Sequence, residues 1–160
     1  NGSEPLVAVW IGSSRALEKR PYMPDIQSFL LSEYQNMLPR YIIMDDDIKL
    51  YRQEFYPLNY FIREAQAVGA DYIIIAEMDG HQPRNSQNWY INMNQSVFNA
   101  NGGLINVISI SKLVSTVSGN MHAAVYAVKE GRTQLKQYLP FIKTRYNKTP
   151  QWISLGEVEN

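Results

Sequence analysis

Three short apolar runs, separated by stretches with helical spacing, constrain the fold of this chain more than any other feature. The runs read LVAVWI, YIIM and DYIIIA and begin at residues 6, 41 and 71. Each is almost continuously apolar, as expected for strands buried on both faces. Apolar residues recur at intervals of three and four from Ile26 to Leu38 and from Leu58 to Val68, which predicts two intervening helices. The order β-α-β-α-β favours parallel strands joined by right-handed crossovers.

The chain changes character after Met78, where alternation replaces the continuous apolar runs. The stretch DGHQPRNSQN (79–88) is rich in turn residues and predicts a polar loop. Trp89 to Val97 alternates apolar with polar residues, which is typical of a strand with one wet face. The residues NANGG (99–103) predict a turn, and a further strand is expected from Leu104 to Ser111.

The last third of the chain is expected to finish the sheet and then form one helix. Residues 112–129 read as strand, with His122 as an exposed cross-strand residue, and Glu130-Gly131 predicts a turn. A helix is expected from Thr133 to about Lys143, burying Leu135, Leu139 and Ile142, although Pro140 interrupts its pattern. The tail from 147 to 160 is expected to be irregular.

These elements predict a single domain over residues 1–160, with a core at about 5–143. The expected fold class is α/β (α+β): a two-layer or three-layer sandwich with a mixed sheet. A β-α-β-α-β parallel core is extended in this prediction by antiparallel strands and a C-terminal helix.

Composition excludes several classes of function. Fifteen Lys and Arg balance fifteen Asp and Glu, so no overall field favours nucleic acid. The chain has no cysteine, which rules out disulfides, thiol catalysis and cysteine-bound metals within it. No apolar stretch approaches the roughly 18 residues of a membrane-spanning helix. Neither a phosphate-binding glycine loop nor a GxSxG elbow is present.

Three consecutive aspartates follow the second apolar run, in YIIMDDDI (41–48). Our preferred interpretation is that they mark the end of a strand, where Asp commonly forms turns. The alternative is a small metal-dependent nucleotide-sugar transferase, in which Asp45 and Asp47 hold Mn²⁺ or Mg²⁺ and Asp79 is a third acid. Under the preferred interpretation the chain has no catalytic residue, no metal site and no cofactor.

The predicted contact surface is the loop at 79–88 together with the turn at 99–103. We expect His81, Arg84, Trp89 and Asn101 to lie on it, because exposed aromatic, amide and guanidinium groups suit protein contacts. An unpaired strand edge there could also accept a strand from a partner. A third interpretation is a module that binds a glycan or small ligand through Trp89 and nearby Asn side chains.

Several segments resemble the TolB amino-terminal-domain-like proteins of Gram-negative envelopes, a group that includes the curli-secretion lipoprotein CsgG. The segment REAQAVGADYIIIAEM (63–78) resembles their helix–"GADY" strand step, and VAVWIG (7–12) resembles their opening strand. PRYIIMDDD (39–47) resembles their second strand, and MHAAVYAVKEGR (121–132) their late strand. Asp46 and Ala127 depart from the family pattern.

This resemblance implies a non-enzymatic lipoprotein of the periplasm or outer membrane. Its partner would be another protein of the cell envelope, and a homo-oligomer is also implied. It would contact the membrane only through a lipid anchor upstream of Asn1, because a lipid-bearing cysteine just before residue 1 would explain the NGSEP start. The family carries no shared catalytic motif, so no catalytic residue is transferred to this chain.

Overall fold

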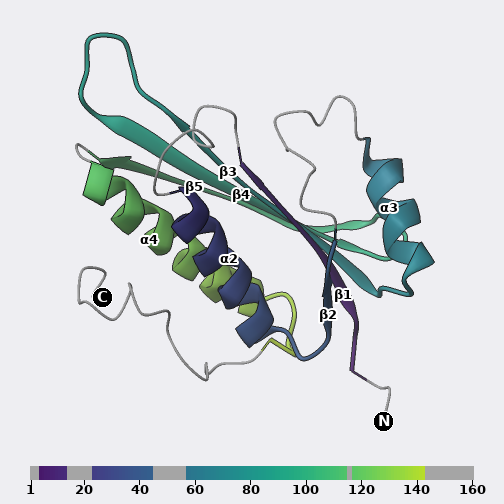
Figure 1. The fold of residues 1–160 in the computed structure, drawn as a ribbon. Coiled ribbons are helices and arrows are strands. Elements are labelled where there is room, and N and C mark those ends of the chain that lie inside the picture. The colour runs from purple at the N-terminus through teal and green to yellow at the C-terminus, as the bar shows by residue number, and fades with distance from the viewer. Residues whose placement is uncertain (1–3, 14–22, 45–56, 115–116, 143–160) are drawn as a thin grey trace.

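Five strands and three helices make up the part of the chain that the computed structural model describes, residues 4–13, 23–44, 57–114 and 117–142 (Figure 1). In chain order they are β1 (Val7–Ser13), α2 (Met23–Met37), β2 (Tyr41–Ile43), α3 (Leu58–Ala67), β3 (Tyr72–His81), β4 (Trp89–Asn99), β5 (Leu104–Val114) and α4 (Val117–Lys136). None of the described helices is long and apolar enough to cross a membrane.

The strands form one mixed sheet in the order β2-β1-β3-β4-β5. β1 is parallel to both of its neighbours, and its Val9 pairs with Ile43 of β2 and with Ile74 of β3. β4 is antiparallel to β3 and to β5. The predicted fold class, a parallel β-α-β-α-β core extended by antiparallel strands and completed by a C-terminal helix, is therefore confirmed.

Helices α2 and α4 lie side by side on one face of the sheet, which we call the two-helix face (Figure 1). The core on this face joins Phe29 and Tyr34 of α2 to Ile74 of β3, Met93 of β4 and Leu135 of α4. The sheet residues that contribute to it alternate along their strands, because successive side chains of a strand point to opposite faces.

Of the described helices, α3 is the one that packs on the opposite face, which we call the one-helix face. Phe61 of α3 meets Trp10 of β1 edge to face, with ring centroids 4.9 Å apart. The helix ends as its sequence predicts, because Gly69 takes a positive φ of 76° and its N–H donates to the Gln66 carbonyl. Ala65 is the other buried residue of this helix, so the buried stripe of α3 is narrow.

A buried polar contact links three elements on the two-helix face. The Tyr34 hydroxyl of α2 donates to Gln95 Oε1 of β4, and Gln95 Nε2 donates to the Gly131 carbonyl of α4 at 3.2 Å. Burial and the nearby Glu33 carboxylate raise the pKa of Tyr34 far above its ordinary value. Tyr34 therefore stays a hydrogen-bond donor, and Gln95 is satisfied although only 1% of it is exposed.

The strand predicted for residues 112–129 is wrong from Val117 onward. Residues 117–136 form helix α4, so His122 lies in a helix, and Glu130-Gly131 is helical rather than a turn. The segment 121–132, matched above to a late family strand, is helical as well. The buried stripe of α4 includes Ala127, Gly131 and Leu135, each four residues apart. The sequence pattern did not indicate this helical spacing, because the small residues Ala and Gly add little to an apolar pattern.

The predicted helix at 133–143 is correct only in its first turn. Helix α4 ends at Lys136, and residues 137–142 form turns. Leu135, Leu139 and Ile142 are nevertheless buried as predicted, in the core of the two-helix face.

Candidate functional site

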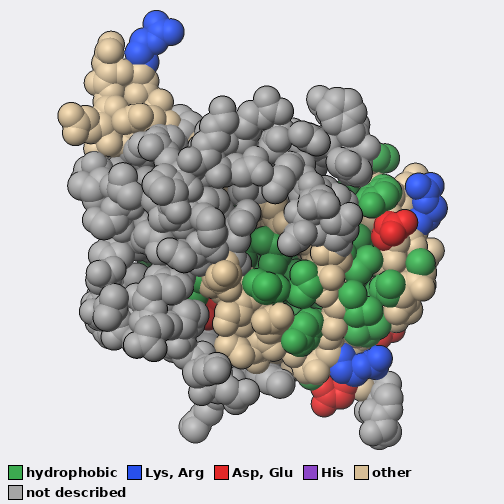
Figure 2. Space-filling view, viewed as in Figure 1, with side chains coloured by type: hydrophobic (Ala, Val, Ile, Leu, Met, Phe, Trp, Pro, Cys, Tyr) green, Lys and Arg blue, Asp and Glu red, His purple; other side chains and the backbone are tan. Residues whose placement is uncertain are grey.

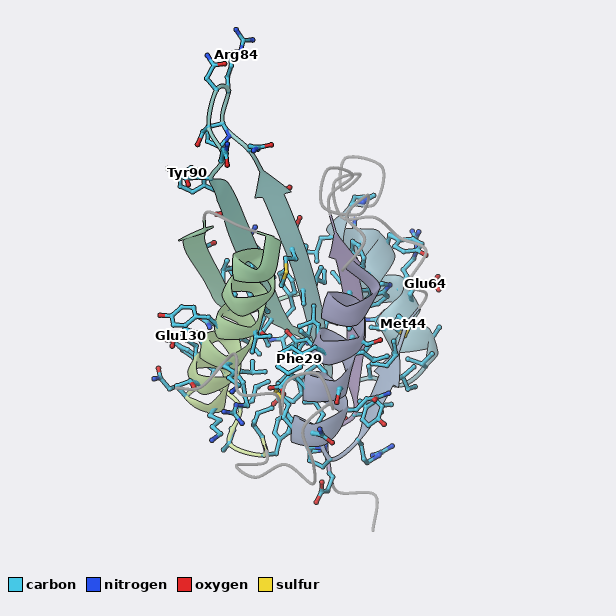
Figure 3. The ribbon with its side chains drawn as sticks, turned by 60° about the vertical axis from the view of Figure 1, so that its left-hand side comes forward. Phe29, Met44, Glu64, Arg84, Tyr90 and Glu130 are labelled. Atoms are coloured by element: carbon cyan, nitrogen blue, oxygen red, sulfur yellow. The ribbon has the colours of Figure 1, made fainter. Side chains whose placement is uncertain are left out.

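The connection between β3 and β4 projects from the body of the molecule. β1 pairs with β3 only as far as Ser13, opposite Met78, and β3 continues to His81, which pairs with Tyr90 of β4. Residues 82–88, which we call the hairpin tip, extend beyond both strands. The projection stands clear of the rest of the surface (Figure 2). Arg84 lies at its far end, and Tyr90 lies at its base (Figure 3).

The hairpin tip is held in shape by its own hydrogen bonds. Gln82 Nε2 donates to the Ser86 carbonyl at 2.8 Å, and the Ser86 N–H donates to the Pro83 carbonyl at 3.3 Å. The Asn88 N–H donates to Ser86 Oγ at 3.0 Å. Asn85 takes a positive φ of 62°, a conformation that Asn tolerates better than most residues. The exposed Arg84 is thus carried on a preformed turn.

The structure places three of the four predicted contact residues at one end of the sheet. His81 is the last residue of β3, Arg84 lies in the hairpin tip, and Trp89 begins β4 opposite Val114. Asn101 lies in the turn at the other end of β4. A strand of eleven residues spans about 33 Å. A single small partner site therefore cannot use all four residues.

The turn between β4 and β5 is rigid and is attached to α3. The Asn99 side chain accepts from the N–H groups of Asn101 and Gly103 at 2.9 and 3.0 Å. Gly102 has a φ of 88°, and an added Cβ there would come within 2.4 Å of Ile62 in α3. Asn101 is exposed on this turn, so its setting is well ordered.

A polar strip crosses the one-helix face beyond the part that α3 covers. We call this strip, formed by Glu77, Asp79, Asn92, Asn94 and Ser109, the polar face. Register brings these residues together, because Glu77 pairs with Asn94, Asp79 with Asn92, and Asn94 with Ser109. Ser109 Oγ donates to Asn94 Oδ1 at 2.5 Å. The polar face offers carboxyl, amide and hydroxyl groups in adjacent rows.

Glu77 has an altered acidity within the polar face. Partial burial, and secondarily the negative charge of Asp79, raise its pKa from 4.5 to about 7. Near neutral pH this carboxyl is divided between its two forms, and the protonated form can donate a hydrogen bond. Neither Glu77 nor Tyr90 was among the predicted site residues. The alternation of polar residues in 77–79 and 92–94 was visible, but the pairing of the two strands was not.

The residues proposed for a metal site are only partly described. Asp45 and Asp47 fall outside the described residues, and Asp79 lies in β3 two positions beyond Glu77. Within the described ranges, no group of three or more His, Asp or Glu side chains is placed to hold a metal ion.

Comparison with known proteins identifies similar folds. No protein-family model matches the chain, and no curated protein matches it. The hypothetical protein CT253 from Chlamydia trachomatis aligns with a TM-score of 0.54 and 10% identity, covering 85% of this chain and 98% of that one. The PelC dodecamer from Paraburkholderia phytofirmans aligns with a TM-score of 0.52 and 10% identity, covering 79% and 83%.

Lipoprotein GNA1162 from Neisseria meningitidis is structurally more distant, with a TM-score of 0.41 and 11% identity over 81% of this chain and 96% of that one. At these identities, the likeness to CT253 and PelC is one of fold.

Proposed function

We propose that this chain is a non-enzymatic protein of the bacterial cell envelope that acts by binding other proteins, with the hairpin tip as its main contact surface. The observation that carries the proposal is the tip itself, which projects from the sheet and is ordered by its own hydrogen bonds. A preformed loop loses little conformational freedom on binding, so more of the contact energy contributes to affinity.

The chemistry of the tip favours a partner with an acidic patch. Arg84 is the sole charged residue between Gly80 and Trp89 in the sequence, and it is exposed at the end of the projection. Its guanidinium can bind a carboxylate through two parallel hydrogen bonds. Tyr90, 37% exposed at the base, adds an aromatic surface, and both residue types are enriched at protein interfaces.

The envelope location rests on the resemblance of residues 7–12, 39–47 and 63–78 to TolB-like proteins. As part of the proposal, the protein acts in the periplasm or at the outer membrane. PelC, whose fold is similar, is a dodecamer in its solved structure, which supports assembly of this chain with further copies as part of the same proposal.

Site-specific photocrosslinking tests this proposal. A photoreactive phenylalanine analogue replaces Gln87, an exposed residue of the hairpin tip, so that Arg84 is kept. The full chain is expressed in the bacterium that encodes it. The matched control places the same analogue at Glu64, which is exposed on α3 away from the hairpin tip (Figure 3). We expect a discrete crosslinked envelope protein from position 87 and none from position 64. Identical products from both positions, or none from position 87, would refute the tip as the contact surface.

The polar face favours a second candidate function, binding of a glycan or another small polar ligand. Paired carboxyl and amide groups in adjacent rows suit the hydroxyls of a sugar, and Tyr90 lies on the neighbouring row of β4. Calorimetric titration of the protein with envelope oligosaccharides tests this candidate. Binding should be lost in Asn92→Ala and kept in the control Gln137→Ala, which changes an exposed residue beyond α4.

A further inference from the structure

Strand β5 is one edge of the sheet in the part of the chain that the structure describes. It is eleven residues long and pairs with β4 on one side. In an edge strand, every second residue directs its N–H and C=O groups away from the sheet. β5 thus offers a row of backbone donors and acceptors along its outer side.

The sequence of β5 itself has few of the features that usually protect an edge strand. Proline, inward charges and clusters of lysine commonly block edge strands. The sequence of β5, LINVISISKLV, contains no proline and one charged residue, Lys112. Val107 is 51% exposed on the one-helix face, where it pairs with Ser96. The irregularity in the β4–β5 pairing lies between Val97 and Phe98 of β4, which pair with the start of β5. The stretch from Asn106 to Lys112 is therefore regular.

The regular stretch is complementary to itself when two copies run antiparallel. With Ser109 opposite Ser109 of a second copy, Ile108 faces Ile110 and Val107 faces Ser111. Lys112 takes the position opposite Asn106, so the one charged residue of each strand does not stand opposite its own copy. Paired β-branched residues stabilise neighbouring strands, whereas like charges placed opposite each other destabilise them.

We infer that β5 pairs with β5 of a second copy of this chain, antiparallel and about a twofold axis at Ser109. The two five-stranded sheets then form one continuous sheet, in which Val107 has Ser111 of the second copy as its cross-strand neighbour. The contact is isologous, so it closes on itself as a dimer. The pairing specifies the assembly with further copies that is part of the proposed function. It uses a different edge of the molecule from the hairpin tip and does not depend on the role proposed for that tip.

Charge variants at the axis test this pairing. In Ser109→Lys, two lysines face each other across the axis, and in Ser109→Glu two glutamates do. Ser109 is exposed, so both variants should fold, which circular dichroism checks. By sedimentation velocity of the full chain from about 1 to about 500 μM, we expect a dimer for the unchanged protein. The dimer dissociation constant of each variant should be at least about tenfold higher than that of the unchanged protein. An equimolar mixture of the two variants should restore the dimer.

Cysteine variants test the register, because the chain contains no cysteine of its own. Oxidation of Ser109→Cys should give a disulfide-linked dimer. Val107→Cys alone should not, because the two copies of residue 107 lie four residues apart along the strands, about 13 Å. A mixture of Val107→Cys and Ser111→Cys should form the mixed dimer.

A protein that stays monomeric up to the highest concentration overturns the inference. A dimer that the Ser109→Lys and Ser109→Glu variants retain also overturns it, because the contact then lies on another surface.

Discussion

On the two-helix face, α2 and α4 together cover the sheet with one large core, whereas on the one-helix face α3 covers only the part around Trp10 and leaves the polar face beyond it. The first face also contains a buried hydrogen-bonded link from Tyr34 through Gln95 to Gly131. Among the described residues, the two-helix face therefore supplies the larger of the two cores. On the one-helix face, the side chains of Glu77, Asp79, Asn92 and Asn94 are half-buried.

The largest expected effect concerns the attachment of α3. Phe61, 2% exposed, is the main buried aromatic residue of that helix, and Phe61→Ala should lower the free energy of unfolding by about 3–5 kcal/mol. Because no other described helix shares its face with α3, hydrogen exchange should accelerate first in residues 58–67, while α2 and α4 stay protected. Phe29→Ala on the two-helix face is the matched control, and it should expose α2 and α4 instead. Continued protection of α3 in Phe61→Ala would show that the two faces do not differ in this way.

The buried polar link on the two-helix face should be the next most sensitive feature. Tyr34→Phe removes the donor to Gln95 and leaves a buried carbonyl oxygen unsatisfied, which should cost about 1–3 kcal/mol in urea unfolding. The double variant Tyr34→Phe/Gln95→Met should recover part of this loss, because both polar partners are then removed. A double variant that is less stable than the sum of the single changes would contradict this account.

Substitution of Gly102, which approaches α3, should destabilise the protein more than substitution of Gly69 at the end of that helix. Gly102→Ala combines a positive φ with a close approach to Ile62, and a loss of about 1–2 kcal/mol is expected. In Gly69→Ala the added Cβ meets nothing within 4 Å, so only the backbone strain remains, about 1 kcal/mol. Thermal unfolding of both variants measures the difference. Equal losses of stability would show that the contact with Ile62 does not contribute.

The contribution of the polar face to stability should depend on pH. The pKa of Glu77 is raised to about 7 in the folded protein, so the folded state holds this proton more tightly than the unfolded chain does. The resulting stability is fully present below about pH 4.5 and is lost as the pH rises through about 7. Glu77→Gln should lack this loss. Its stability relative to the unchanged protein should therefore rise by about 1 kcal/mol between pH 4.5 and 8, since solvent screens a partly exposed group.

Urea titrations at several pH values measure this effect. Asp79→Asn, which removes the neighbouring negative charge, should shift the same transition to lower pH. A pH profile that is identical in the Glu77→Gln variant and the unchanged protein would contradict it.

The smallest effect is expected where α4 approaches the sheet. A Cβ at Gly131 would lie 3.4 Å from Met93 Cε and 3.6 Å from Gln95 Oε1, which is ordinary van der Waals contact. Gly131→Ala should therefore stabilise the helix by about 0.5–1 kcal/mol, seen as a higher midpoint in urea. A lower midpoint would show that α4 packs too tightly on the two-helix face for even one methyl group.

The parallel half of the fold could be predicted from the sequence because its signals are local. Each strand there is an apolar run, and α3 combines an apolar stripe with a terminating glycine. Helix α4 could not be predicted in the same way. Its buried residues Ala127 and Gly131 carry almost no apolar signal. The position of Gly131 makes sense only beside Met93 and Gln95 of β4.

The candidate site could be predicted only in part. The hairpin tip follows from turn residues between two strands, so the position of Arg84 was accessible from sequence. The polar face depends on register, because Glu77 meets Asn94 only once β3 and β4 are aligned. A difference of one residue in that alignment would send the carboxyl to the opposite face, and no local pattern fixes it.

The position of β1 between β2 and β3 has a consequence for the order in which the molecule assembles. β3, β4 and β5 are joined by connections of 7 and 4 residues, whereas 58 residues separate the end of β1 from the start of β3. Closing short loops costs less entropy, and local pairing forms faster than distant pairing. We therefore expect the three-stranded meander to form first and to serve as a template. β1 leaves the ribosome before the other strands, yet it must wait for β3 before its place in the sheet exists.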